Sequence, residues 1–160
     1  MNDTQDAHMG EWAAKRARME AHIRRYFDAC NAPARQGLMD SFTDDAVHYF
    51  PANRRYGPWR GAAAIADGWL ATVKHTRAVW TVDRVLIDPT RDEAAIEWTQ
   101  FRPASGKILR GDEWYLFDPA SGKIKEVRCY FAAPEPDDAK VTELGGFDYA
   151  GRGYPLRPPR

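Results

Sequence analysis

Apolar side chains recur at helical spacing in the first part of the chain. Between Glu11 and Asn31 they stand mostly in steps of three, four or seven, at Trp12, Met19, Ile23, Tyr26, Phe27 and Cys30. Such steps place side chains on one face of a helix. Pro33 ends the pattern, because a proline disfavours helical geometry at the residue before it. The spacing predicts an amphipathic helix over 11–31 with this stripe buried.

Two shorter helices are expected next. One covers 35–42 and turns Leu38, Met39 and Phe42 inward, and the other covers 62–73 and turns Ile65, Trp69 and Val73 inward. Between these helices the sequence predicts a turn at 44–45, a short strand over 47–50 and a loop over 51–61. The loop holds two prolines, two glycines and three arginines, which is typical of irregular structure.

After residue 78 the apolar period changes from 3.6 to 2. Segments 79–87, 94–102, 108–117 and 124–131 are rich in Val, Ile, Trp, Tyr and Phe and are joined by short Pro- and Gly-containing turns. Consecutive strands with short links form an antiparallel meander. Helices followed by strands predict an α+β fold, a cone-shaped antiparallel or mixed sheet wrapped around three N-terminal helices.

The chain length allows one domain. We expect residues 1–10 to be a flexible N-terminus, 11–133 the domain, and 134–160 a C-terminal extension that acts as a lid or packs at a dimer interface. The 160 residues carry 23 basic and 23 acidic side chains. Because these charges balance, no field is present to hold a polyanion, and we expect no nucleic acid partner.

Cysteine usage and hydropathy indicate a compartment. Cys30 and Cys129 are the two cysteines, and two scattered thiols do not form a disulfide framework. Residues 1–10 are polar and lack the apolar stretch of a signal peptide. No apolar run approaches the roughly 20 residues of a membrane span. We therefore expect a cytoplasmic protein with no membrane contact.

Three stretches of sequence resemble a known superfamily. Residues 25–32 (RYFDACNA) and 38–47 (LMDSFTDDAV) resemble the opening of ketosteroid isomerases and SnoaL-like polyketide cyclases. Residues 117–131 (FDPASGKIKEVRCYF) resemble the last hairpin of that superfamily and of limonene epoxide hydrolases. The resemblance covers about residues 11–132 and implies a nuclear transport factor 2-like fold around one apolar pocket.

The isomerases' catalytic residues match this sequence only in part. The resemblance places their carbonyl-polarising tyrosine on Tyr26 and their second, proton-donating acid near Asp112 or Glu113. Their aspartate general base falls on Phe50, which cannot accept a proton. Steroid isomerisation by the known route is therefore not expected.

The catalytic residues of two other families are also replaced. The last-strand aspartate of limonene epoxide hydrolases falls on Cys129, and their arginine and other aspartate fall near Trp98 and Gln100. The His–Asp dyad of scytalone dehydratase-like members falls near Trp80 and Asn31. The resemblance therefore implies the fold without assigning the reaction.

Side-chain alternation along the strands predicts which residues line the pocket. In the register of the family the inner face carries His48, Phe50, Trp98, Gln100, Glu113, Tyr115, Phe117, Val127, Cys129 and Phe131. The outer face carries Tyr49, Thr99, Phe101, Trp114, Leu116, Arg128 and Tyr130. This outer face is too apolar for water. We expect a homodimer through it, as is common in these families.

Three kinds of polar side chain are candidates for catalysis. His48 titrates near neutral pH and can move a proton in either direction. Tyr26 can donate a hydrogen bond to a carbonyl or a developing enolate. Glu113, or Asp112 if the register slips by one residue, would have a raised pKa among Trp and Phe. Each also has a purely structural interpretation. His48 can be a buried core histidine, Tyr26 can belong to the apolar stripe of its helix, and the acid can be solvated or paired with an arginine.

The remaining candidates shape the cavity or bind the ligand. They are Phe50, Tyr56, Trp59, Trp80, Trp98, Gln100, Tyr115, Cys129 and Phe131. Tyr56 and Trp59 lie in the loop at the expected mouth of the pocket and can cover a ligand. The arginines of this loop have two interpretations: they bind a carboxylate or phosphate of the ligand, or they pair with acidic side chains at the surface. Cys129 is a nucleophile beside His48 if the two touch, and otherwise a small buried apolar residue. The histidine spacing fits no metal site, and we expect neither metal nor cofactor.

Three hypotheses follow. The first is an enzyme of the isomerase, dehydratase, cyclase or hydratase type that performs cofactor-free acid/base chemistry on a small apolar substrate with a carbonyl or hydroxyl group. The second is a non-catalytic module of the same fold that binds a ligand or a partner. The third is a structural dimerisation domain, which predicts an interior filled by its own side chains.

Overall fold

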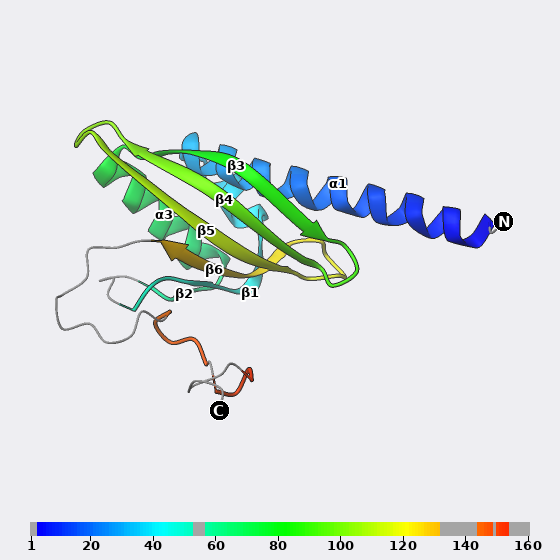
Figure 1. The fold of residues 1–160 in the computed structure, drawn as a ribbon. Helices are drawn as coiled ribbons and strands as arrows, with labels where there is room; N and C mark the ends of the chain where they lie inside the picture. The colour runs from blue at the N-terminus through cyan, green and yellow to red at the C-terminus, as the bar shows by residue number, and fades with distance from the viewer. Residues whose placement is uncertain (1–2, 53–56, 132–143, 149, 154–160) are drawn as a thin grey trace, which may run out of the picture.

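The computed structural model describes residues 3–52, 57–131, 144–148 and 150–153, with side chains from residue 8 onward. Figure 1 shows the arrangement of the elements. In chain order they are α1 (Asp3–Asn31), α2 (Arg35–Asp40), β1 (Phe42–Tyr49), β2 (Trp59–Arg60), α3 (Ala62–Thr76), β3 (Val79–Asp88), β4 (Glu93–Arg102), β5 (Lys107–Phe117) and β6 (Ile124–Phe131).

The strands form one curved mixed sheet in the order β2-β1-β6-β5-β4-β3. Strands β3 to β6 make the predicted antiparallel meander, whereas β1 pairs in parallel with β6. The helices lie on one face of the sheet, and the N-terminal part of α1 extends beyond it (Figure 1). The α+β fold predicted from the sequence is confirmed.

Several element boundaries differ from those predicted. Helix α1 begins at Asp3 instead of Glu11. The end of the helix projects beyond the sheet and buries no apolar stripe, so the apolar spacing that predicted the helix does not extend to its first residues. For the same reason Trp12, predicted to face inward, is 43 % exposed. Helix α2 ends at Asp40, and the predicted turn at 44–45 lies inside β1, where the register with β6 shifts. The predicted loop over 51–61 contains the two-residue strand β2.

The rest of the α1 stripe forms the core with the inner face of the sheet. Ile23, Tyr26, Phe27 and Cys30 are all buried there. At the end of the helix Asn31 ties α1 to β3: its Nδ2 donates to the Trp80 carbonyl at 2.9 Å, and the Trp80 amide donates to its Oδ1 at 2.8 Å. This pair of hydrogen bonds fixes the distance between the helix layer and the sheet.

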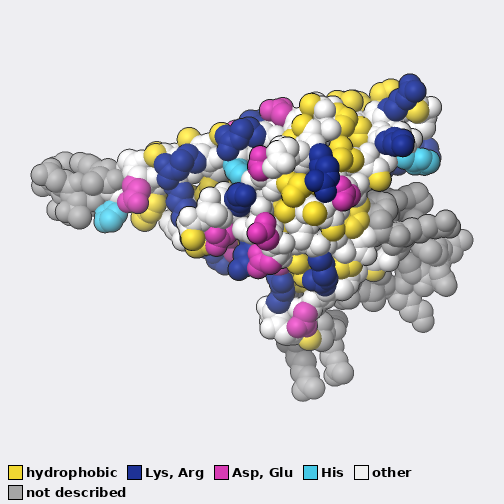
Figure 2. Space-filling view, turned by 180° about the vertical axis from the view of Figure 1, so that it is seen from behind, with side chains coloured by type: hydrophobic (Ala, Val, Ile, Leu, Met, Phe, Trp, Pro, Cys, Tyr) yellow, Lys and Arg dark blue, Asp and Glu magenta, His cyan; other side chains and the backbone are white. Residues whose placement is uncertain are grey.

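Charged side chains are distributed over the face opposite to that seen in Figure 1. Basic and acidic side chains are intermixed across this face and along the projecting helix, and apolar side chains gather toward the end away from that helix (Figure 2). Among the described residues, no helix combines the length and the apolar character that crossing a bilayer requires.

Replacing Asn31 with Ala should lower the free energy of unfolding by about 2 kcal/mol, because it leaves both Trp80 backbone groups without their partner in a poorly solvated position. Urea unfolding followed by circular dichroism measures the change. Gln36→Ala is the control, since it removes an exposed side-chain bond to Asp40 and should cost less than about 0.5 kcal/mol. Equal losses in the two variants would contradict this role of Asn31.

Candidate functional site

Three neighbouring strands bring polar side chains together inside the sheet. His48 is on β1, Cys129 on β6, and Glu113 and Tyr115 on β5. The registers pair His48 with Val127 and Glu113 with Cys129, so these side chains lie within two positions of one another across the sheet. His48 is 0 % exposed and Glu113 is 3 % exposed. The parallel β1–β6 pairing is therefore what places the histidine near the acid.

Glu113 is the centre of this buried cluster. Its Oε2 accepts a hydrogen bond from the Tyr115 hydroxyl, and the Cys129 thiol also donates to the carboxyl group. Its Oε1 lies 3.9 Å from His48 Nε2. Burial raises the pKa of Glu113 to about 7, and the bonds from Tyr115 and Cys129 oppose this rise only in part. Both protonation states are therefore populated near neutral pH.

His48 is enclosed by aromatic rings. It stacks on Phe50 with ring centroids 4.3 Å apart and an interplanar angle of 10°, and it meets the rings of Trp59 and Trp69 at 5.9 and 5.5 Å. Burial lowers the pKa of His48 to about 3, and the Tyr49 backbone opposes this only weakly. Neither ring nitrogen has a hydrogen bond of regular geometry within the described part of the chain. The ring is therefore neutral at pH 7.

Tyr26 approaches the cluster from α1. It is 1 % exposed and packs edge-on against Phe27 and Phe42, each with ring centroids 5.1 Å away. Burial, followed by the nearby Cys30, Glu113 and Cys129, raises the pKa of Tyr26 well above its usual value. The phenol therefore stays protonated and is a hydrogen-bond donor at any physiological pH.

The other predicted site residues divide into three groups. Asp112 lies on the outer face and is exposed, because side chains alternate along β5 and Glu113 takes the inward position. Tyr56 lies outside the described residues. The interior holds the rest, with Trp59 and Phe131 partly buried: Phe50, Trp59, Trp80, Trp98, Gln100, Tyr115, Cys129 and Phe131.

Trp69 was not among the site residues predicted from the sequence. Its indole contacts the rings of His48, Trp59 and Trp80, and its Nε1 has no hydrogen-bond partner among the described residues. Gly68 beside it leaves room for Trp59, since a Cβ there would lie 2.5 Å from the indole Cε2. The available signal was the inward position of Trp69 on α3, four residues after Ile65.

The described part of the chain contains no set of side chains that could bind a metal ion. No group of three or more His, Cys, Asp or Glu side chains there could hold an ion. The three groups that approach one another, Glu113, His48 and Cys129, instead lie with the Tyr115 hydroxyl around the Glu113 carboxyl group. This arrangement fits proton transfer.

Residues 23–127 match the SnoaL-like domain family. The chain belongs to this family. A protein of unknown function with a cystatin-like fold from Methylobium petroleophilum PM1 shares 47 % identity with this SnoaL-like chain, over 91 % of this chain and 95 % of that one, with a TM-score of 0.86. No curated protein matches it.

More distant solved structures share the fold of this SnoaL-like protein. A putative polyketide cyclase from Sinorhizobium meliloti is 20 % identical and has a TM-score of 0.58, covering 69 % of this chain and 94 % of that one. A putative polyketide cyclase from Xanthomonas campestris is 17 % identical with a TM-score of 0.58, covering 74 % and 93 %. At these identities the likeness establishes the nuclear transport factor 2-like fold alone.

The two shifted pKa values have opposite effects on stability. Glu113 has a folded pKa above its ordinary 4.5, so its contribution is complete below pH 4.5 and is lost as the pH rises through 7. His48 has a folded pKa below its ordinary 6.5, so its contribution is complete above pH 6.5 and is lost as the pH falls toward 3. Between pH 4.5 and 6.5 the two dependences largely cancel.

Glu113→Gln should therefore gain about 3 kcal/mol in free energy of unfolding relative to the native chain as the pH rises from 4.5 to 7.5. His48→Asn should gain about 4 kcal/mol relative to the native chain as the pH falls from 6.5 to 3. Urea unfolding at each pH gives these differences. The exposed Glu97→Gln serves as control, and a pH-independent difference for either site variant would show that its native group titrates normally.

Proposed function

We propose that this SnoaL-like chain is a cofactor-free acid/base enzyme acting on a small, mostly apolar substrate that bears a carbonyl or hydroxyl group. Its reaction would be of the isomerase, dehydratase, cyclase or hydratase type, and the same proposal places it in the cytoplasm. The observation that supports it is the buried Glu113 carboxyl group, whose pKa is raised to about 7 among aromatic rings and proton-bearing side chains. A pKa near the working pH is what general acid/base catalysis requires.

The proposed step is a proton transfer through Glu113. The carboxylate takes a proton from the carbon beside the substrate carbonyl, and the electron pair of that bond moves onto the carbonyl oxygen. Tyr26 donates a hydrogen bond to the developing oxyanion. After the Glu113 proton exchanges with solvent, its return to the same carbon completes α-hydrogen exchange. In a β,γ-unsaturated ketone its return to the γ-carbon of the dienolate completes an isomerisation without loss or gain of atoms.

His48 has a different role from the acid or base that the sequence suggested. Because its pKa is lowered to about 3, it remains neutral at pH 7 and is not in the imidazolium form that acts as a general acid. A neutral imidazole still carries one N–H donor and one acceptor nitrogen. In the proposal His48 orients the substrate oxygen beside Glu113, and Glu113 is the proton carrier.

Access to Glu113 requires movement of its neighbours. His48, Tyr26 and Tyr115 are at most 1 % exposed, so the described residues around them pack closely against their side chains. A ligand must therefore displace aromatic side chains such as Trp59, which is only partly buried. Closed packing is the feature expected of the structural dimerisation domain, whereas the alternative, a non-catalytic ligand-binding or accessory module, would need the same movement to admit a ligand.

The names of the two putative polyketide cyclases support the choice of substrates to test. Those names belong to the proteins from Sinorhizobium meliloti and Xanthomonas campestris. For the present chain they favour cyclic ketones and aromatic polyketide-like ketones as probes, because these carry an acidic C–H bond beside a carbonyl group.

With such ketones the native chain should catalyse exchange of the α-hydrogen for deuterium in heavy water, which NMR detects directly. Glu113→Gln should slow this exchange at least about 100-fold, since the amide cannot carry the proton. Tyr26→Phe should slow it about 10-fold. Asp112→Asn is the matched control, because it also replaces a carboxylate with its amide, one residue away on the outer face of the sheet.

Exchange at the native rate in Glu113→Gln would exclude the proposed acid/base role. Saturable ketone binding without any exchange would support the binding module instead. The absence of both would leave the structural dimerisation domain as the better account of this fold.

The outer face of the sheet supports a homodimer as part of the same proposal. Phe101, Ile108, Trp114 and Tyr130 are 39 to 59 % exposed on neighbouring strands. Val79 extends this face, because it pairs with Phe101, which in turn pairs with Ile108. A row of apolar side chains this long is unfavourable in water unless a second surface covers it.

Phe101→Glu combined with Ile108→Glu should shift the molecular mass in sedimentation equilibrium from a dimer to a monomer, because two charges per subunit would be buried without partners. Arg18→Glu, on exposed helix α1, is the control and should leave the mass unchanged. A monomeric native chain at micromolar concentration would contradict the dimer.

A further inference from the structure

The described C-terminal residues, 144–148 and 150–153, pack against β1 and β6 from the outer side of the sheet. Leu144 and Phe147 form a small second core with Tyr49, in which the two aromatic rings meet edge-on at 5.3 Å. Leu144 and Phe147 are 3 % and 7 % exposed, as buried as residues of the main core. We call these C-terminal residues the latch segment.

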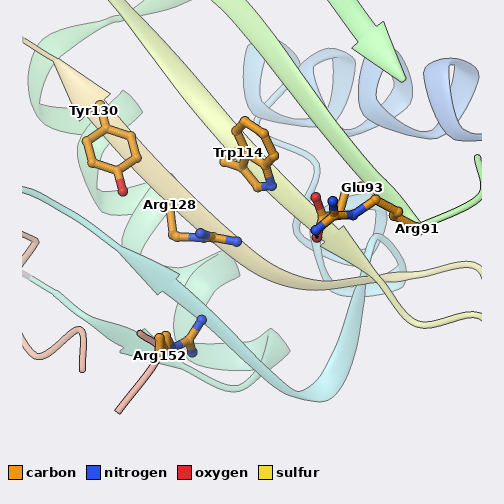
Figure 3. Close-up of a pocket in the computed structure, with 6 residues that line it drawn as sticks. All are labelled: Arg91, Glu93, Trp114, Arg128, Tyr130 and Arg152. Carbon is orange, nitrogen blue, oxygen red and sulfur yellow. Dashed lines mark ion pairs between the residues drawn. The ribbon is translucent and has the colours of Figure 1, made fainter. Parts of the chain in front are cut away.

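Arg152 anchors the latch segment to the sheet. Its two terminal nitrogens donate to both oxygens of Glu126 on β6, at 2.8 and 2.6 Å. Its guanidinium also lies 4.3 Å from the Phe147 ring centre. Arg128, which pairs with the same carboxylate at 3.1 Å, lines one outer-face hollow together with Arg152 (Figure 3). Bidentate pairs of this kind fix orientation as well as position.

A tight turn presents Arg152 to Glu126. The Gly151 amide donates to Asp148 Oδ1 at 2.8 Å, and the Arg152 amide donates to the Asp148 carbonyl at 3.2 Å. A side chain at position 151 would require the Asp148 carboxyl group to move from the position it takes in this turn. The turn therefore holds the guanidinium group in the direction that the ion pair needs.

The latch segment also pairs with the chain just beyond β1. Strand β2 covers the edge of β1 only opposite Val47 and His48. Further along, the Gly145 amide donates to the Phe50 carbonyl at 2.9 Å, and Leu144 forms an isolated antiparallel β-bridge with Pro51. The segment therefore takes over the sheet edge where β2 ends.

Alternation along β1 connects these outer contacts with the interior. Tyr49 points outward to Phe147, while His48 and Phe50 on either side of it point inward and stack on each other. Since the His48 ring nitrogens have no regular hydrogen bonds in the described region, ring stacking and the backbone of β1 determine where the ring lies. Contacts that hold the backbone of residues 49–51 in place therefore also hold the His48 ring in place.

We propose that the latch segment positions His48 and Phe50 beside Glu113, and that the Arg152–Glu126 pair closes it. Arg152 is a positioning residue, because it acts through the end of β1 and touches none of the proton-transfer groups. Its consequence for catalysis rests on the proposed function. Its effect on the geometry and solvation of the buried cluster does not.

The test uses the full chain with Arg152→Gln, which keeps hydrogen-bonding capacity and removes the charge. Arg84→Gln is the matched control, since it removes an exposed arginine–glutamate pair with Glu97 from the same sheet. NMR records the ring signals of His48 and the pH midpoint of the labelled Glu113 carboxyl group in each variant. Urea unfolding verifies that each variant is folded under these conditions.

Arg152→Gln should move the His48 ring signals away from their stacked positions and lower the Glu113 midpoint by about one pH unit toward 4.5, because loosening of the strand end admits water. Arg152→Lys should restore part of this shift, and Arg84→Gln should produce none. Phe147→Leu, which removes the ring contacts with Tyr49 and Arg152, should act in the same direction as Arg152→Gln.

Native-like His48 signals and a native Glu113 midpoint in both Arg152→Gln and Phe147→Leu would overturn the latch. An equal shift in Arg84→Gln would overturn it too, since the effect would then not belong to this segment. Neither readout depends on turnover. A failure of the latch is therefore distinct from a failure of the proposed function, which shows as unchanged deuterium exchange in Glu113→Gln.

Discussion

The parallel pairing of β1 with β6 is the contact on which the site depends. A meander of β3 to β6 alone has Glu113, Tyr115 and Cys129 on its inner face but no histidine. Pairing His48 with Val127 adds the histidine to this face, one strand away from Cys129. It also gives α3 and α1 a continuous surface to cover. The N-terminal half of the chain thereby encloses the polar groups of the C-terminal half.

Desolvation then determines the protonation states in the enclosed cluster. The same burial that raises the pKa of Glu113 lowers the pKa of His48, because it disfavours the charged form of each group. The result is a neutral histidine beside a carboxyl group that ionises near pH 7. An acid and a base of ordinary pKa values would form an ion pair at this distance, and the aromatic surroundings prevent it.

The two faces of β1 connect the interior with the surface. Tyr49 faces outward and joins the packing of Leu144 and Phe147, while His48 faces the acid. One strand therefore carries both a site residue and the residue through which the C-terminal segment holds it. In the proposed latch, Arg152 and Glu126 complete this connection away from the buried cluster, so that a charge pair on the outer face bears on a carboxyl group on the inner face.

Local pattern in the sequence determined the secondary structure and the faces. Helical spacing predicted α1 and α3, period-two alternation predicted β3 to β6, and the same alternation put Glu113 inside and Asp112 outside once the register was known. The resemblance of residues 25–47 and 117–131 to SnoaL-like proteins identified the fold. Each of these signals depends on neighbours within a few positions, which is why the sequence alone contains them.

The tertiary structure decided what depends on contacts between distant segments. The Tyr115 bond to Glu113 and the ring contact of Trp69 with His48 join side chains that only the packed fold brings together. The roles of the two titrating groups also changed, because a pKa follows from the solvent that the whole fold removes. The Arg152–Glu126 pair joins residues 26 positions apart on different elements. No local pattern predicts it, because its energy exists only after the sheet and the C-terminal turn have formed.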